Sequence, residues 1–163
     1  MAVDAFLKIE GIDGESTDEQ HKDAIAISSF SFGVSNPMTI SSATGGAGAG
    51  KAQFQDFHFT TSMSKASPKL MQACATGQHI KESTLFCRKA GGNERAPVEF
   101  LKITLTDLLV SSYQTGGSND IIPTDQFSLN FAKIEFDYTP QKADGTLGSV
   151  VLASWDLKAN KKV

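Results

Sequence analysis

Apolar residues at every second position predict several short strands. The first covers 5–9 and is followed by a glycine-containing turn over 11–16. In three places the apolar positions change parity: from Ile25 and Ile27 to Phe30 and Phe32 across Ser28-Ser29, from Val98 and Phe100 to Leu101 and Ile103, and from Phe127, Leu129 and Phe131 to Ile134 and Phe136 across Ala132-Lys133. Because strand side chains alternate faces, each change predicts a bulge or a bend.

Bends of this kind suit a strongly curved sheet. We therefore predict a mainly β fold, a curved and closed β-barrel of antiparallel strands, formed by one domain over 1–163. An alternative explanation is that both sheet faces are partly buried, one by the core and one by a partner. Further strands are predicted at 84–87 and 150–157, with loops at 88–93, 113–120 and 140–148, and the polar segment 17–23 is expected to be exposed.

One short helix is predicted beside the barrel. Ser67 is placed as its N-cap, Pro68 at its first position and Gly77 just past its end. Leu70, Met71 and Cys74 would form its apolar face. A helix of about nine residues is marginal by itself, so it must dock on the sheet.

Composition narrows the function classes. The net charge is −3, with 15 basic and 18 acidic residues, which argues against nucleic acid or an anionic membrane as a partner. Cys74 and Cys87 are the only cysteines, and they lack zinc-site spacing. They could form one bridge, but we expect two reduced, buried thiols. The charged start of the chain does not resemble a secretory signal, and no apolar run is long enough to span a membrane. We expect folding in the cytoplasm and export, if any, by dedicated machinery.

The segment Gly45–Lys51 fits most of a phosphate-binding P-loop, G-x-x-x-x-G-K. Position 52 is Ala, however, where the motif needs a hydroxyl for magnesium. The downstream residues 53–60 alternate like a strand, whereas a P-loop opens a helix. We interpret 44–51 as a flexible loop, with a nucleotide hydrolase as the weaker alternative.

Other candidate groups for chemistry are sparse. His21, His58 and His79 have no neighbours with ligand or triad spacing, so we assign them surface or structural roles. Asp107 is expected to face water at a strand end. Arg88 and Lys89 look like an anion clamp, but two basic residues before a Gly-Gly turn are more often solvated or paired with acids on a neighbour. We predict no catalytic residue, no cofactor and no metal, and therefore no enzyme.

Several short residue strings are more specific than the spacing of the apolar residues. They make the chain resemble the Hcp family, the tube-forming proteins of bacterial type VI secretion. The resemblance runs nearly end to end and rests on strings in this order: 1–9 MAVDAFLKI, 14–16 GES, 65–70 KASPKL, 88–92 RKAGG, 110–117 VSSYQTGG, 129–134 LNFAKI and 138–145 YTPQKADG.

The resemblance implies a β-barrel flanked by a short helix, assembled into a six-membered ring whose copies stack into a tube. It also implies ejection by a contracting sheath, with sheath, baseplate and spike proteins as partners and small effector proteins carried in the lumen. The extended loop of the family matches about 36–51, and the resemblance implies that it reaches a neighbouring subunit or ring. The candidate contact residues are Ser41, Ser42, Thr44, Gly45, Gly46, Gly48, Gly50, Lys51, Arg88 and Lys89. A phage-type tail tube protein is the nearest alternative.

Overall fold

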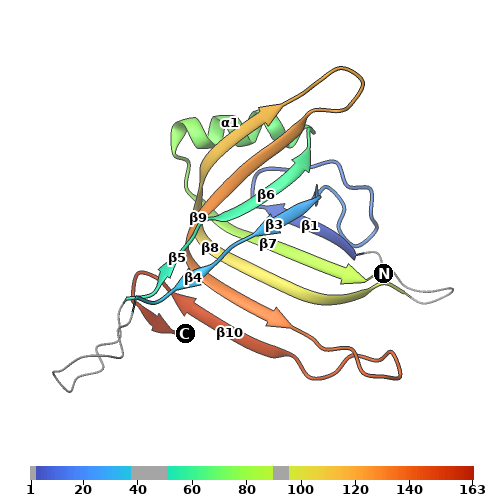
Figure 1. Ribbon diagram of the computed structural model, residues 1–163, viewed down its shortest axis with the longest axis vertical. Helices are drawn as coiled ribbons and strands as arrows, with labels where there is room; N and C mark the ends of the chain where they lie inside the picture. Colours follow the sequence, from blue (N-terminus) through green and yellow to red (C-terminus); the bar gives the residue numbers. More distant parts are fainter. Residues whose placement is uncertain (1–2, 38–50, 90–95) are drawn as a thin grey trace.

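A computed structural model describes residues 3–37, 51–89 and 96–163 (Figure 1). The elements in chain order are β1 (Val3–Ile9), β2 (Ile25–Ile27), β3 (Ser29–Ser31), β4 (Val34–Ser35), β5 (Gln53–Phe54), β6 (Phe57–Ser62), α1 (Ala66–Thr76), β7 (Ile80–Lys89), β8 (Val98–Gly116), β9 (Thr124–Tyr138), β10 (Val151–Asp156) and β11 (Lys161–Lys162). The protein is mainly β with one helix, as the sequence predicts.

Nine strands form one antiparallel sheet. Its order is β11-β10-β9-β8-β7-β1-β2, and β6 also pairs with β9 and carries β3 on its other side. The two long strands β8 and β9 curve strongly and span most of the molecule in Figure 1. The first half of β9 pairs with β6, and its second half pairs with β10. The long central hairpin therefore supports two different sets of neighbours at its two ends.

The predicted bend between Ile27 and Phe30 is confirmed at Ser28. This residue separates β2 from β3, and the two strands pair with different partners, β1 and β6. The Ser28 N–H donates to the Thr60 carbonyl at 2.8 Å, which fixes the bend against β6. A parity change in the sequence thus corresponds to a change of neighbour within the sheet.

The second predicted irregularity also lies where the pattern places it. In the β7–β8 pairing Cys87 faces Leu101 but Arg88 faces Glu99, so Phe100 is the extra residue of a bulge. A further register shift, which the sequence pattern does not reveal, lies between Val110 and Ser112.

The third parity change lies within β9. Phe127, Leu129 and Phe131 are buried, and the next buried residue is Ile134. Across this change the Ala132 carbonyl accepts the Leu157 N–H at 2.8 Å, from the turn that follows β10. The side chains therefore change face where β9 leaves β6 and begins to pair with β10.

The core lies inside the curved sheet and is rich in phenylalanine. The Phe57 and Phe59 rings stack with centroids 4.7 Å apart, and Phe59 stacks on Phe127 at 5.3 Å. Phe57 is fully buried at 0% exposure, and Phe32 packs against it at 4.7 Å. His58 points the other way and is exposed, as its place between two buried aromatics predicts.

The helix exists, but two predictions about it are wrong. It begins at Ala66 after the N-cap position Lys65, so Ser67 lies inside the first turn and is not the N-cap. Its buried face consists of Ala66, Ser67, Leu70 and Ala73, whereas Met71 is 53% exposed. Small residues let the helix lie close to the sheet, so its buried face includes alanines. The spacing of the large apolar residues did not indicate this face. The end at Gly77 is confirmed, with φ of 65°.

Three loop predictions also need correction. Arg88 and Lys89 continue β7, so these two residues do not belong to the loop predicted over 88–93. Tyr113 to Gly116 continue β8 in pairing with β9, so the loop begins at Gly117. The segment 17–23 is not uniformly exposed, because His21 is 4% exposed. The loop over 140–148 and the strand after it are confirmed, with β10 beginning at Val151.

Candidate assembly surfaces

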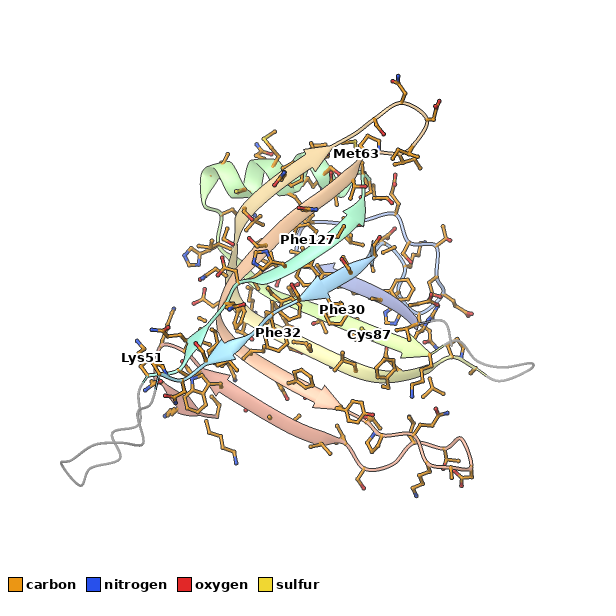
Figure 2. All side chains as sticks on the ribbon, viewed as in Figure 1. Phe30, Phe32, Lys51, Met63, Cys87 and Phe127 are labelled. Carbon is orange, nitrogen blue, oxygen red and sulfur yellow. The ribbon has the colours of Figure 1, made fainter. Side chains whose placement is uncertain are left out.

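The glycine-rich stretch is anchored on a two-stranded ladder. Val34 pairs with Phe54 and Ser35 with Gln53, so β4 and β5 bring its two ends together. The candidate contact residues from Ser41 to Gly50 lie outside the described residues. Lys51 is described and exposed at the foot of the stretch, and Figure 2 shows it at one end of the molecule.

A P-loop needs a helix directly after its lysine, because the helix N-terminus faces the phosphate. Here residues 53–54 form β5, β6 follows, and the helix begins only at Ala66. The predicted strand downstream of Lys51 is therefore confirmed. No helix begins directly after Lys51, so the helix N-terminus that a P-loop needs for phosphate binding is missing there.

Arg88 lies near the end of β7 and is largely buried, at 9% exposure. Its Nη1 donates to Asp18 Oδ1 at 3.0 Å, and Nη2 donates to the other oxygen of the same carboxylate. Its Nε lies 3.6 Å from Asp4 Oδ2, and its guanidinium carbon lies 4.8 Å from the Phe6 ring centroid. The hydrogen bonds from Arg88 lower the pKa of Asp18, and those with Asp18 raise the pKa of Arg88. The acids that pair with Arg88 therefore belong to the same chain.

His21 fills the space beside this pair. Its ring lies 4.9 Å from the Phe6 ring and 4.6 Å from the Phe86 ring. Its Nε2 is 2.7 Å from Glu99 Oε1, although the two groups are not aligned as a hydrogen bond. His21 is thus a structural residue that holds the loop after β1 against the outer face of the sheet. Its polar neighbours in the sequence give no signal of this burial.

Lys89, the other basic candidate, is half-buried, and its Nζ lies 5.2 Å from the Phe100 ring centroid. This geometry favours a cation–π contact.

Asp107 lies in the middle of β8 with a left-handed φ of 55°, not at a strand end as predicted. Its carboxylate does face water. One oxygen accepts from Lys158 Nζ at 2.6 Å, and the other lies 3.1 Å from His79 Nδ1. Hydrogen bonds from Lys158 and then His79 lower the pKa of Asp107. This cluster connects the end of the helix, the long strand and the C-terminal segment.

The strand β10 is exposed along most of its length. Val151 is 63% exposed and its neighbour Leu152 is 56% exposed, although consecutive strand residues point to opposite faces. On its outer side only Trp155 and Asp156 pair with β11. Isolated proteins protect such edges with charges, proline or a cover, and Val150 to Ser154 carry none of the charged or proline residues. The sequence predicts the strand but not its exposure.

The hollows and polar clusters offer little for chemistry. One hollow, of about 610 Å³, lies between β1, β7 and the loop after β1, and its lining residues include lysines and acids but no histidine or cysteine. Within the described ranges, no three His, Cys, Asp or Glu residues come together as metal ligands. Both thiols are free; Cys87 is buried, while Cys74 is only half-buried. Burial raises the pKa of Cys87 to about 11, so this thiol is a poor nucleophile at neutral pH.

Fold and surface together define a class of protein: a curved antiparallel β subunit with an unprotected apolar edge, which is typical of proteins that assemble. Known proteins give the family. The family profile described as "Type VI secretion system effector, Hcp" matches residues 6–138. The chain is 44% identical to protein hcp1 of Pseudomonas aeruginosa, over 98% of each chain. It therefore belongs to the Hcp family of secreted type VI secretion tube proteins.

Solved structures agree with this assignment. Hcp1 from Salmonella typhimurium is 35% identical, with a TM-score of 0.82 and coverage of 100% of both chains. A second solved structure, of a type six secretion system protein, is 32% identical, with a TM-score of 0.91 and coverage of 99% of this chain and 100% of the other. Within the described part of the chain, no helix has the length and apolar character needed to cross a bilayer.

Proposed function

We propose that the chain is a ring-forming subunit of the type VI secretion tube and that β10 makes its contact with the next subunit. The exposure of β10 on both faces and along its edge is the observation that carries this proposal. A ring needs two different patches per subunit, because a head-to-tail contact closes only when each patch meets its complement. The family resemblance sets the expected number of subunits at about six.

The proposal includes closure of the barrel through the bent segment 25–31. Its first half pairs with β1 and its second half with β6, which itself pairs with β9, so this one segment connects the β2 end of the strand order to the β6 branch on β9. The Thr61 hydroxyl also donates to the Ala26 carbonyl at 2.6 Å, next to the bend. Closure at this place would protect the edges of β2 and β3 and leave β10 as the long free edge.

We further propose that the stretch 36–51, from Ser41 and Ser42 through the glycines to Lys51, contacts a neighbouring subunit or ring. The β4–β5 ladder pairs the residues that flank this stretch, so its two ends lie close together. Lys89 is the last residue of β7 and is a second candidate for such a contact. Arg88 would support that contact from within the chain, since Asp18 and Asp4 occupy its guanidinium.

Within this proposal the stacked rings are ejected by a contractile sheath. The proposed partners are other copies of the chain, the spike, sheath and baseplate proteins, and small effectors in the lumen. The match to the type VI secretion family supports these partners. Co-purification of the tagged protein with products of neighbouring genes would identify them, and capsid or tail proteins of a phage among them would favour the phage-type alternative.

The contact through β10 is tested by Val151→Lys. A charge on this strand should prevent pairing with a neighbour while the subunit stays folded, because the Val151 side chain is mostly exposed. We expect an unchanged far-ultraviolet circular dichroism spectrum and a fall in mass from ring to monomer in light scattering. Met71→Lys is the matched control, since Met71 is 53% exposed on the helix. A Val151→Lys protein with the wild-type mass would show that β10 is not the contact.

A further inference from the structure

A hollow of about 390 Å³ lies where the helix end, the two long strands and the C-terminal segment meet. Leu109, Phe131 and Leu157 are among its apolar lining residues, and all three are buried or half-buried. Lys51 and Lys158 lie at its opening and are exposed. The hollow therefore combines an apolar floor with a basic rim.

The rim has an excess of positive charge. Asp107 pairs with Lys158, at 2.6 Å, and with His79, at 3.1 Å. Lys51 forms no ion pair with any residue of the ranges that the structure describes. A carboxylate that approaches this rim next to apolar groups would meet both charge and surface complementarity.

The tip of the β8–β9 hairpin has the opposite character. Ile121 and Ile122 are 66% and 69% exposed, the two largest exposures among the big apolar side chains of the described ranges. Asp120 precedes them with a φ of 78° and is the only charged residue in 117–123. An acid followed by two exposed isoleucines is an unusual sequence for a solvated hairpin tip, because exposed apolar side chains of this kind normally pack against another surface.

The tip and the hollow of one chain lie far apart. Figure 1 shows the hairpin between β8 and β9 extending from the end of the molecule at which α1 lies. Figure 2 shows Lys51, at the rim of the hollow, at the other end. The hollow is lined at mid-strand by β8 and β9, so it is a different surface of the subunit from the hairpin tip. Two different complementary surfaces on one subunit form a head-to-tail contact, which repeats without limit when it does not close.

We propose that the tip formed by Asp120, Ile121 and Ile122 inserts into this hollow on a second copy of the chain. The isoleucine side chains lie on the apolar floor, and the Asp120 carboxylate faces Lys51 and Lys158. This inference rests on the proposed assembly function and assigns a specific contact to it. One tip buries less surface than a stable interface needs, so the contact acts through its repetition around the assembly.

Cysteine cross-linking tests the contact directly. In a Cys74→Ser background, Ile122→Cys and Leu109→Cys are introduced together, and the concentrated protein is oxidised mildly. We expect a ladder of cross-linked subunits on a non-reducing gel. The control pairs Leu109→Cys with Met71→Cys, an exposed helix position, and should give no ladder. A ladder from the control alone, or from neither pair while stacked rings are visible, would overturn the proposal.

Charge reversal separates this contact from ring formation. Asp120→Lys should leave the mass of the ring unchanged but abolish stacking, and the added change Lys51→Glu should restore it, because Lys51 has no ion pair among the described residues. Stacks of normal length in Asp120→Lys would overturn the proposal and leave the ring intact as the proposed function. A wild-type protein that forms no ring would remove both. Cross-linking of Ile122→Cys to a different protein would show that another partner occupies the tip.

Discussion

The docking of α1 depends on a buried hydroxyl–carboxylate contact, and Ser67→Ala tests it. The Ser67 hydroxyl donates to one oxygen of Asp125, which is 1% exposed, and the Tyr113 hydroxyl donates to the other at 3.1 Å. Ser67 Oγ also accepts the Ser64 N–H at 3.0 Å. The Ser67 side chain therefore links the first turn of the helix to Asp125 of β9 and also accepts a backbone hydrogen bond from the residue just before the helix.

The expected cost follows from these two bonds. Loss of the hydrogen bond to the buried Asp125 carboxylate should lower the free energy of unfolding by about 1.5–3 kcal/mol. Loss of the acceptor for the Ser64 N–H should lower it by a further amount of about 0.5–1.5 kcal/mol. Alanine favours the helix over serine by about 0.5 kcal/mol, which offsets part of this. We therefore expect Ser67→Ala to lower the free energy of unfolding by about 1.5–4 kcal/mol.

The assay is equilibrium urea unfolding at a fixed concentration at which the subunits are dissociated, since assembly would add to the apparent stability. Met71→Ala is the control on the same helix and should change the free energy by no more than about 0.5 kcal/mol, because Met71 is exposed. A Ser67→Ala cost below about 1 kcal/mol would refute the network. An ordinary N-cap, the role predicted for Ser67 from the sequence, typically contributes about 1 kcal/mol.

Three further predictions concern the Arg88–Asp18 pair, the thiols and the glycine-rich stretch. Arg88 holds the pKa of Asp18 below its ordinary 3.8, so the stability that Asp18 contributes is complete above pH 3.8 and is lost as the pH falls through the lower folded-state pKa. The difference in urea midpoint between wild type and Asp18→Asn should be constant at neutral pH and close in acid; a difference that persists in strong acid would contradict this. Burial raises the pKa of Cys87 to about 11, so a thiol reagent at about pH 8 should modify Cys74 rapidly and Cys87 only after unfolding. Two rapidly reacting thiols in the native protein would be evidence against a closed core around Cys87. Deletion of 45–50 should leave the subunit folded, because loop closure changes by less than about 0.6 kcal/mol, but should impair assembly; a large fall in melting temperature of the dissociated subunit would show that the stretch is part of the fold.

Strand parity predicted the curvature of the sheet well. The apolar positions around Ser28 and Phe100 change face because the chain itself bends or bulges there, and such changes are local enough to leave a trace in the sequence. The shift between Val110 and Ser112 leaves no such trace, since small polar residues occupy both faces at that point. Periodicity reports a bend only where large apolar residues flank it.

Burial that depends on distant residues could not be predicted in the same way. His21 stands among polar neighbours, and only the rings of Phe6 and Phe86 on two other strands bury it. Met71 fits the apolar period of the helix, yet the sheet contacts the adjacent alanine stripe instead. The exposure of β10 was likewise hidden, because an apolar strand has the same sequence whether it faces a core or a second subunit.

The mass and shape of the purified wild-type protein test the assembly account most directly. Light scattering gives the mass, and electron microscopy of the same sample gives the shape. We predict annular particles of about six subunits, joined through the free edge of β10. A monomeric mass at high protein concentration, with no annular particles, would contradict the account.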